Sequence, residues 1–222
     1  MHTVTSAAAS AGRLPGSRPA TATRVAVAGA TGFTGQELLR LLARHGSVTL
    51  TLATSSSAQS AARPLPALGH LWDGAITPLD PAALTREAEL VFLALPDRAA
   101  AELAPTLVEQ GLRVIDLSGA FRLRDASVRA RWYPETHTIP PGLAYGLTEF
   151  ERDAVRSARL VSNPGCYPTT SLLALKPLLA AGLLVPGADV IIDAKSGVSG
   201  AGKTPTERTH FSECHEIGRA HV

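Results

Sequence analysis

A cysteine at the start of a predicted apolar helix is the residue of this sequence best placed to do chemistry. Residues 163–168 read Asn-Pro-Gly-Cys-Tyr-Pro, and leucines at helical spacing follow them. At a helix N-terminus, unpaired backbone N–H groups and the helix dipole favour an anion, so a thiol there readily forms a thiolate. We therefore predict that Cys166 is a nucleophile. A small buried thiol is the alternative reading of this stretch.

The second chemical signal is a glycine-rich turn near residue 30. Residues 25–28 (Val-Ala-Val-Ala) predict a buried strand, residues 29–35 (Gly-Ala-Thr-Gly-Phe-Thr-Gly) a turn, and residues 36–45 a helix. This order is typical of dinucleotide-binding folds, in which glycines let the backbone approach a pyrophosphate at the helix N-terminus. The spacing is G-x-x-G-x-x-G rather than the commoner G-x-G-x-x-G, so an ordinary glycine turn is the alternative. The predicted cofactor-binding residues of this turn are Gly29, Thr31, Gly32, Phe33, Thr34 and Gly35.

The end of the second predicted strand, over residues 48–54, indicates which cofactor fits. An NAD site places a carboxylate there for the ribose 2′-hydroxyl, whereas residues 54–57 read Thr-Ser-Ser-Ser. Hydroxyl groups can donate to a 2′-phosphate, and Arg63 follows in the next loop. Ser55 and Ser56 therefore predict NADP(H), with a polar loop that binds nothing as the alternative.

Four segments together resemble the N-acetyl-gamma-glutamyl-phosphate reductases of arginine biosynthesis. They are residues 29–42, 116–123, 163–169 and 196–202, within a resemblance that runs from about residue 24 to about residue 215. The run Gly-Cys-Tyr-Pro-Thr favours this family over the related aspartate-semialdehyde dehydrogenases and aminoadipyl phosphate reductases, which are the alternatives. The stretch 116–122 (Asp-Leu-Ser-Gly-Ala-Phe-Arg) departs from the family pattern, in which Ala-Asp often precedes Phe-Arg.

The resemblance implies a reaction and further site residues. Cys166 would attack N-acetylglutamyl 5-phosphate, phosphate would leave, and NADPH would reduce the resulting thioester to the semialdehyde. Asn163 and Arg122 are implied as substrate-binding residues, with a structural salt bridge as the alternative role for Arg122. The implied cofactor contacts outside the glycine turn are Leu95, Pro96, Ser196 and Gly197. The resemblance also implies a homo-oligomer at full length and an acid/base histidine in a segment beyond Val222.

One segment fits a different class of site. Residues 197–204 (Gly-Val-Ser-Gly-Ala-Gly-Lys-Thr) match the P-loop pattern and follow a predicted strand over residues 190–193. A P-loop lysine begins a helix that packs on the sheet, but residues 207–213 carry no apolar stripe. We therefore favour a glycine-rich loop beside the nicotinamide and the substrate, as the resemblance implies. A P-loop NTPase and a nucleotide-binding module without catalysis are the other classes.

Composition argues against several other classes. The 222 residues carry a formal net charge of +2 without a sustained basic run, which gives no case for nucleic acid. Cys166 and Cys214 form no disulfide framework and fit a cytoplasmic protein. No apolar run approaches the roughly 20 residues that span a bilayer. His210, Cys214 and His215 are weak candidates for a metal site, and we expect no metal.

The alternation of predicted strands and helices favours an α/β fold. We expect a Rossmann-type doubly wound parallel sheet over residues 24–162, followed by an incomplete α+β catalytic domain over residues 163–222. Residues 1–23 predict a disordered extension, with a transit peptide as the alternative. The last seven residues are also what the adapter-like string GAGATCGGAAGAGCACACGTC would encode. We therefore expect a C-terminally truncated chain.

The remaining elements are predicted from periodicity and breakers. Helices are expected over residues 97–110 and 149–157, the second with a capping box formed by Thr148 and Glu151. Further strands are expected over residues 90–95, 114–117 and 160–161. Loops are expected from the end of the second strand to about residue 80, and over the proline-containing residues 122–147.

Overall fold

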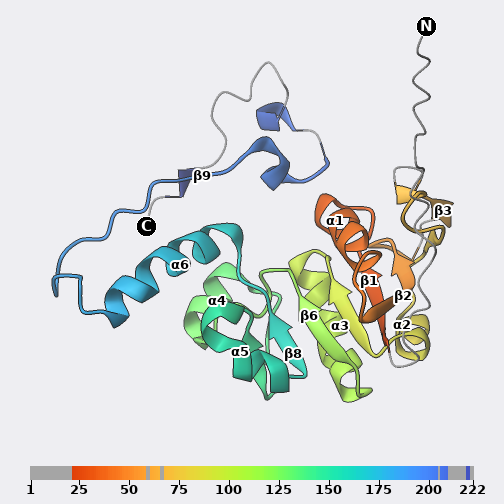
Figure 1. Cartoon of the computed structure of the whole chain (residues 1–222), viewed down its shortest axis with the longest axis horizontal. Helices are drawn as coiled ribbons and strands as arrows, with labels where there is room; N and C mark the ends of the chain where they lie inside the picture. The colour runs from red at the N-terminus through yellow and green to blue at the C-terminus, as the bar shows by residue number, and fades with distance from the viewer. Residues whose placement is uncertain (1–21, 59–60, 66–67, 205, 210–218, 221–222) are drawn as a thin grey trace, which may run out of the picture.

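A mainly parallel sheet forms the centre of the chain (Figure 1). The computed structural model describes residues 22–58, 61–65, 68–204, 206–209 and 219–220. Seven strands of the sheet run parallel and β3 lies antiparallel at one edge, in the order β3-β4-β2-β1-β5-β6-β8-β7. Their bounds are β1 Thr23–Ala28, β2 Val48–Thr54, β3 Arg63–Pro64, β4 Ala75–Thr77, β5 Leu90–Leu93, β6 Arg113–Asp116, β7 Leu143–Tyr145 and β8 Leu160–Ser162.

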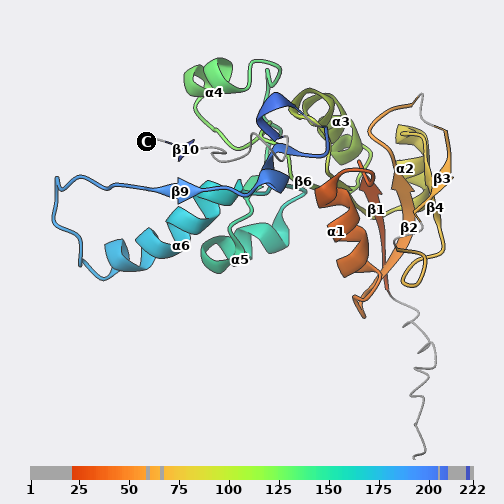
Figure 2. The ribbon, with the colours of Figure 1, turned by 90° about the horizontal axis from the view of Figure 1, so that it is seen from above.

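Helices cover both faces of this sheet, so the predicted doubly wound α/β class is confirmed. On one face lie α1 (Phe33–Leu42) and α5 (Thr148–Ser157), and on the other lie α2 (Pro81–Glu87), α3 (Asp97–Glu109) and α4 (Ala126–Trp132) (Figure 2). Side chains alternate between the faces along each strand. In β1, Val25 and Val27 therefore pack with α1, whereas Ala26 and Ala28 pack with α2 and α3.

The order of the strands reverses between β1 and β5. From β1 the chain proceeds outward to β2 and β4, and it then returns to β5 on the other side of β1. In open α/β sheets, ligands bind outside the carboxyl ends of the strands at such a switch point. The edge of the sheet that carries Gly29 and Leu95 is therefore the expected ligand edge.

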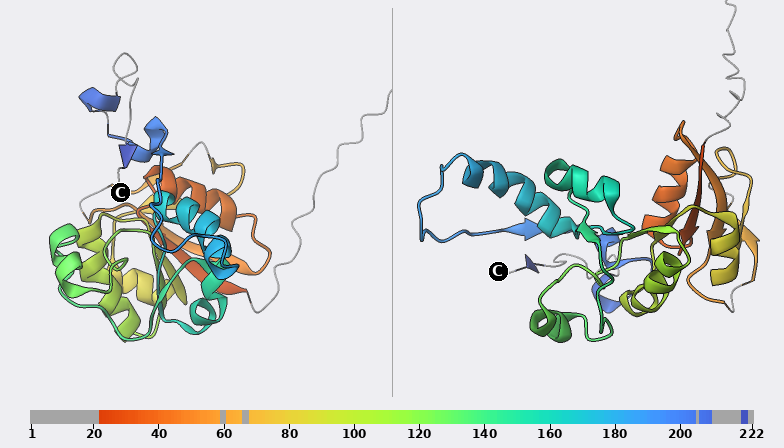
Figure 3. Two further views of the ribbon diagram at one scale, coloured as in Figure 1. Left: turned by 90° about the vertical axis from the view of Figure 1, so that its left-hand side faces the viewer. Right: turned by 90° about the horizontal axis from the view of Figure 1, so that it is seen from below.

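After the sheet, α6 leads away from it and the chain then runs back toward it through β9 (Figure 3). It contains α6 (Cys166–Ala180), β9 (Ala194–Lys195), the 3₁₀ helices η2 (Val198–Ala201) and η3 (Glu207–Thr209), and β10 (Arg219–Ala220), which pairs antiparallel with β9. No residue of α6 is buried, and several large apolar side chains of this region are exposed. They are Leu173, Leu178, Leu179, Leu183, Val185, Val190, Ile191 and Val198.

Several predicted elements are wrong. Residues 190–193 form no strand, and Ile191 is 90% exposed. The region predicted to be irregular over residues 122–147 contains α4 and β7, and the loop predicted to about residue 80 contains β3 and β4. The expected capping box is absent, because the N-cap of α5 is Leu147 and Glu151 has non-helical backbone angles.

Two further predictions concern the ends of the chain. The extension over residues 1–23 lies almost wholly outside the described residues, as do His210, Cys214, His215 and most of the last seven residues. Among the described helices, none combines the length and hydropathy needed to cross a bilayer.

Candidate active site

Five loops that carry the predicted site residues meet at one edge of the sheet. Parallel strands present their carboxyl ends on the same side. The glycine turn follows β1, Ser55 follows β2, Leu95 follows β5, Leu117 follows β6, and Asn163 follows β8. The sheet therefore brings these segments to one edge, although 134 positions of sequence separate Gly29 from Asn163.

The three glycines of the turn have different reasons to lack a side chain. Gly29 has a φ of +88°, and a Cβ there would lie 2.1 Å from the Ala94 carbonyl oxygen. A Cβ on Gly35 would lie 2.2 Å from the Gly29 oxygen, because α1 packs tightly on β1. The atom nearest to a Cβ on Gly32 is the same oxygen at 3.7 Å, an ordinary contact. Nothing within the described chain therefore requires glycine at position 32, which fits a backbone that a ligand approaches closely.

The N-terminus of α1 is suited to bind an anion. Gly32 is its N-cap, no side chain caps it, and its first turn has no acidic residue. The first helical hydrogen bond runs from the Gln36 N–H to the Gly32 oxygen at 3.0 Å. The N–H groups of residues 33–35 therefore precede this ladder and point out of the helix end. These residues fit the pyrophosphate of a dinucleotide.

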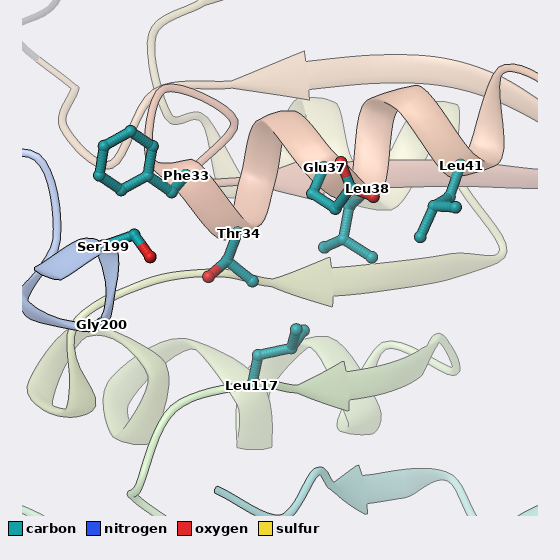
Figure 4. A pocket seen from close by; sticks show the side chains of 8 residues that line it. All are labelled: Phe33, Thr34, Glu37, Leu38, Leu41, Leu117, Ser199 and Gly200. Atoms are coloured by element: carbon teal, nitrogen blue, oxygen red, sulfur yellow. The ribbon is translucent and has the colours of Figure 1, made fainter. Parts of the chain in front are cut away.

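A cavity of about 470 Å³ opens beside this helix (Figure 4). Phe33 and Thr34 line it from α1, Leu117 from the loop after β6, and Ser199 from η2. Lys203 also reaches this place, with its Nζ 5.4 Å from the centre of the Phe33 ring. The predicted cofactor residues Ser196 and Gly197 directly precede η2, so the structure brings their loop to the first turn of α1.

The P-loop reading of residues 197–204 is wrong. Residues 198–201 form a 3₁₀ helix, and Gly202 follows with a φ of +86°. Among the residues described after Lys203, the only helical segment is the three-residue η3. A P-loop needs an α-helix that begins at this lysine, and the described chain has none there.

The two predicted serines of the loop after β2, Ser55 and Ser56, differ in their exposure. Ser55 is 4% exposed, and its hydroxyl donates to the Ser57 oxygen at 2.7 Å. Ser56 is exposed. The Thr54 oxygen accepts the N–H groups of Gly29 and Ala30, at 3.0 and 2.7 Å, and thereby joins this loop to the glycine turn. Of these two serines, Ser56 is therefore the one whose hydroxyl is open to a ligand.

Cys166 is the first residue of α6, as predicted, and its side chain is exposed. Gly165 is the N-cap, and the Thr169 N–H donates to its oxygen at 3.0 Å. Pro168 has no N–H, so the N–H groups that precede this bond belong to Cys166 and Tyr167. No acidic residue lies in the first turn. The alternative of a buried structural thiol is therefore wrong.

Arg122 joins two of the loops at this edge. Its Nε donates to the Asn163 oxygen at 3.0 Å, and its Nη2 donates to the Leu117 oxygen at 2.8 Å. The Asn163 N–H in turn donates to the Asp116 oxygen at 2.8 Å. The structure thus brings the predicted substrate residues Arg122 and Asn163 together, two residues before the N-cap of α6. Among the described residues, Arg122 makes no ion pair with a carboxylate.

Comparison with known proteins identifies the family. Residues 24–158 match a family model described as semialdehyde dehydrogenase, NAD binding domain. The chain belongs to the semialdehyde dehydrogenase family. Residues 166–221 match a second model of this family, semialdehyde dehydrogenase, dimerisation domain. The first match shows that the domain with the glycine turn binds a nicotinamide cofactor, and the predicted domain boundary after residue 162 stays a prediction.

Individual relatives agree with this family. The N-acetyl-gamma-glutamyl-phosphate reductases of Magnetococcus marinus and Halorhodospira halophila are 45% and 47% identical to the chain, and each alignment covers 89% of this chain and 58% of the relative. The chain therefore spans less than two thirds of the length of these curated relatives. An aspartate semialdehyde dehydrogenase from Francisella tularensis shares the fold, with a TM-score of 0.55 at 16% identity over 82% of this chain and 46% of that one.

The sequence analysis did not identify one buried acid, Asp116, as a residue of this site. Asp116 is fully buried at the end of β6, where its carboxylate accepts the N–H and the hydroxyl of Ser118 at 3.0 and 2.8 Å. Burial raises the pKa of Asp116 above 3.8, although these hydrogen bonds and the nearby Arg122 charge oppose the shift. Asp-x-Ser directly after a buried strand is the sequence signal of such a turn. Asp116 therefore shapes the turn whose Leu117 oxygen Arg122 engages.

Residues 119 and 120 are Gly-Ala where the family pattern often has Ala-Asp, and the structure gives a reason for this difference. A Cβ on Gly119 would lie 2.1 Å from the Cε1 atom of the Tyr133 ring, so the ring takes the space of an alanine methyl group. Ala120 is fully buried, and an aspartate there would need a partner for its charge. The Gly119 N–H donates instead to the carboxylate of Asp97 at 2.6 Å. The loop therefore keeps its shape without the acid that is common at position 120.

Proposed function

We propose that this protein is an N-acetyl-gamma-glutamyl-phosphate reductase, which converts N-acetylglutamyl 5-phosphate to N-acetylglutamate 5-semialdehyde and phosphate. One observation carries the proposal. An exposed cysteine begins a helix at the ligand edge of a dinucleotide-binding sheet, in a chain about 45% identical to relatives that bear this name. Acyl phosphates need an activated sulfur and donors for the developing oxyanion, and the start of α6 offers both.

In the first step the Cys166 thiolate attacks the acyl carbonyl carbon. A carbon–sulfur bond forms, and the carbonyl electron pair moves to oxygen, where the dipole at the start of α6 stabilises the charge. The pair then returns, the bond to the phosphate oxygen breaks, and inorganic phosphate leaves a thioester on Cys166. The bound nicotinamide supplies the hydride that reduces this thioester. Expulsion of the Cys166 thiolate releases the aldehyde and restores the nucleophile.

The cofactor in this proposal is NADPH. The N–H groups of residues 33–35 would hold the pyrophosphate, and the loops at Leu95–Pro96 and Ser196–Gly197 are the ones that would contact the nicotinamide, which supplies a hydride when bound. No acidic residue occurs over residues 48–58, so nothing in β2 or its loop repels a 2′-phosphate. The exposed hydroxyl of Ser56 donates to that phosphate, and Ser55 shapes the loop from inside.

Arg122 and Asn163 define the substrate side of the proposal. Two nitrogens of Arg122 engage main-chain oxygens, so its remaining nitrogen, Nη1, is the one that can bind a substrate phosphate or carboxylate. The match of residues 166–221 to a dimerisation domain supports a homo-oligomer. Under this proposal the protein's partner is a small acyl phosphate.

Acylation of the thiol tests this function directly. The chain is mixed with N-acetylglutamyl 5-phosphate without NADPH, and intact-mass spectrometry follows the N-acetylglutamyl adduct while a colorimetric assay follows phosphate. We expect a hydroxylamine-sensitive adduct on Cys166, none in the Cys166→Ser variant, and less with aspartyl phosphate. The Cys214→Ser variant is the matched control and should keep the adduct. An adduct that persists in Cys166→Ser, or equal reaction with aspartyl phosphate, would contradict the proposal.

A further inference from the structure

The side chain of Arg122 fills the space beside Gly165, the N-cap of the nucleophile helix. A Cβ built on Gly165 would lie 3.0 Å from Nη1 of Arg122 and 3.5 Å from its Cζ atom. Gly165 itself has an ordinary backbone conformation, with a φ of −69° and a ψ of 165°. Any residue can adopt these angles. The space for a side chain at position 165 is therefore limited by the neighbouring guanidinium and not by the backbone.

The guanidinium cannot easily move away from Gly165. Its Nε and Nη2 atoms are bound to the oxygens of Asn163 and Leu117, which lie in two different loops. A planar fork that donates to two oxygens has one position that satisfies both. Displacing it for a methyl group would lengthen at least one of these bonds. The guanidinium is therefore fixed beside Gly165 by its bonds to the loops that follow β6 and β8.

We propose that Arg122 is a positioning residue for Cys166, which fixes the loop over residues 163–165 and hence the first turn of α6, and that Gly165 is its matched partner. The proposal rests on Cys166 as the nucleophile, and it assigns Arg122 a role that precedes any contact with substrate. Because α6 buries no side chain, its N-terminal anchor supplies much of what holds Cys166 in place. The N–H groups that favour the thiolate act only while this turn is formed.

A double-mutant cycle on the 222-residue chain tests the pairing. All variants carry Cys214→Ser, so that Cys166 is the only thiol, and the rate of iodoacetamide labelling is measured near neutral pH. Gly165→Ala and Arg122→Ala should each slow labelling by about two- to fivefold, the size of a helix-terminus effect. In the Arg122→Ala background, Gly165→Ala should change the rate by less than about 1.5-fold, because the space is then empty. Gly46→Ala is the control, since a Cβ at Gly46 meets nothing within 4 Å.

Amide hydrogen exchange gives a readout that needs neither the thiol nor activity. The Asn163 N–H is bound to the Asp116 oxygen, and the Thr169 N–H closes the first turn of α6. Both amides should exchange about tenfold faster in Arg122→Ala and in Gly165→Ala, whereas Gly46→Ala should leave them unchanged. Arg122→Lys keeps the charge but can reach only one of the two oxygens, so it should lose the same protection.

Three results would overturn the proposal. The first is a Gly165→Ala variant whose Cys166 is labelled as fast as that of Gly46→Ala. The second is a double variant whose labelling rate falls by the product of the two single effects. The third is an Arg122→Lys variant whose Asn163 and Thr169 amides exchange as slowly as in the unmodified chain. If Arg122→Ala does not fold, as judged by circular dichroism, Gly165→Ala and Arg122→Lys still decide the question. Failure of the proposed function would look different, because a Cys166→Ser variant would then keep its activity whatever the cycle shows.

Discussion

The three glycines of the β1–α1 turn allow cofactor binding to be separated from folding. We expect Gly32→Ala to weaken the cofactor site without destabilising the chain, and Gly35→Ala to do the reverse. A Cβ at position 32 has only an ordinary contact of 3.7 Å, whereas one at position 35 lies 2.2 Å from a main-chain oxygen. Both substitutions add one methyl group within a single helical turn, so each serves as the control for the other.

The stability changes can be estimated from these distances. Alanine at the N-cap is less favourable than glycine by about 0.5–1 kcal/mol, but it restricts the unfolded chain by about 0.4–1 kcal/mol in the opposite direction. Gly32→Ala should therefore leave the melting temperature within about 2 °C, since 1 kcal/mol shifts a chain of this length by roughly 2–4 °C. Overpacking at Gly35 costs about 1–3 kcal/mol, which lowers the melting temperature by roughly 2–12 °C.

The loss of cofactor affinity can be estimated in the same way. A methyl group at position 32 would keep the pyrophosphate away from the N–H groups of residues 33–35, and one charge-assisted hydrogen bond contributes about 2 kcal/mol. The dissociation constant for NADPH should then rise roughly 30-fold. At NADPH equal to about 100 times the original constant, the ligand stabilises the unmodified chain by about 2.7 kcal/mol and the variant by only about 0.9 kcal/mol.

Fluorescence titration and thermal melts with and without NADPH measure both quantities. The reasoning fails if Gly32→Ala binds NADPH within about threefold of the unmodified chain. It also fails if Gly32→Ala unfolds at as low a temperature as Gly35→Ala, because glycine would then be required by the fold.

The remaining predictions concern two side chains at the same edge. Because burial raises the pKa of Asp116 above its unfolded value of 3.8, the folded chain holds this proton more tightly, and stability falls as the pH rises through the unfolded and then the folded pKa. Asp116→Asn should flatten this dependence when urea unfolding is followed from pH 3.8 upward, and an unchanged slope would contradict it. Ser56→Asp should weaken NADPH binding by about fivefold, since unit charges 4 Å apart in water repel by about 1 kcal/mol. The matched Ser56→Asn variant and NADH titrations should show no such loss, and equal loss for both cofactors would contradict a 2′-phosphate contact.

Much of the sheet and the site could be predicted because their signals are local. The run Val-Ala-Val-Ala before the glycines defines β1, and the start of α6 at Cys166 follows from the proline-glycine pair and the leucines after it. The start of α1 was predicted three residues late, since Gly35 was assigned to the turn. In the structure Gly35 is helical and allows α1 to approach β1, a tertiary requirement that periodicity does not reveal.

The errors arise where contacts that leave no periodic pattern in the sequence decide the local structure. Residues 190–193 have the composition of a strand but no neighbouring strand in the described chain, so their backbone forms none. The seven-residue α4 depends on Arg129, which is 7% exposed and donates to the oxygens of Leu123, Arg124 and Thr136. A buried arginine with three main-chain partners leaves no periodic pattern. The pairing of Arg122 with Gly165 was invisible for the same reason, because 43 positions separate them.

Because α6 is exposed, the reactivity of Cys166 depends on how much of the time this helix is ordered. A helix of 15 residues without buried side chains is marginally stable by itself. Beyond its N-terminus, Lys176 holds it with an ion pair to Glu151 at 3.6 Å and a contact of 4.4 Å to the Phe150 ring. Whatever covers Leu178 and Leu179 shifts the population toward the ordered helix, and with it the population of activated thiolate. Under the proposed function, an oligomer that covered these two leucines would stabilise the first turn of α6, and Cys166 would then react faster in the oligomer than in the single chain.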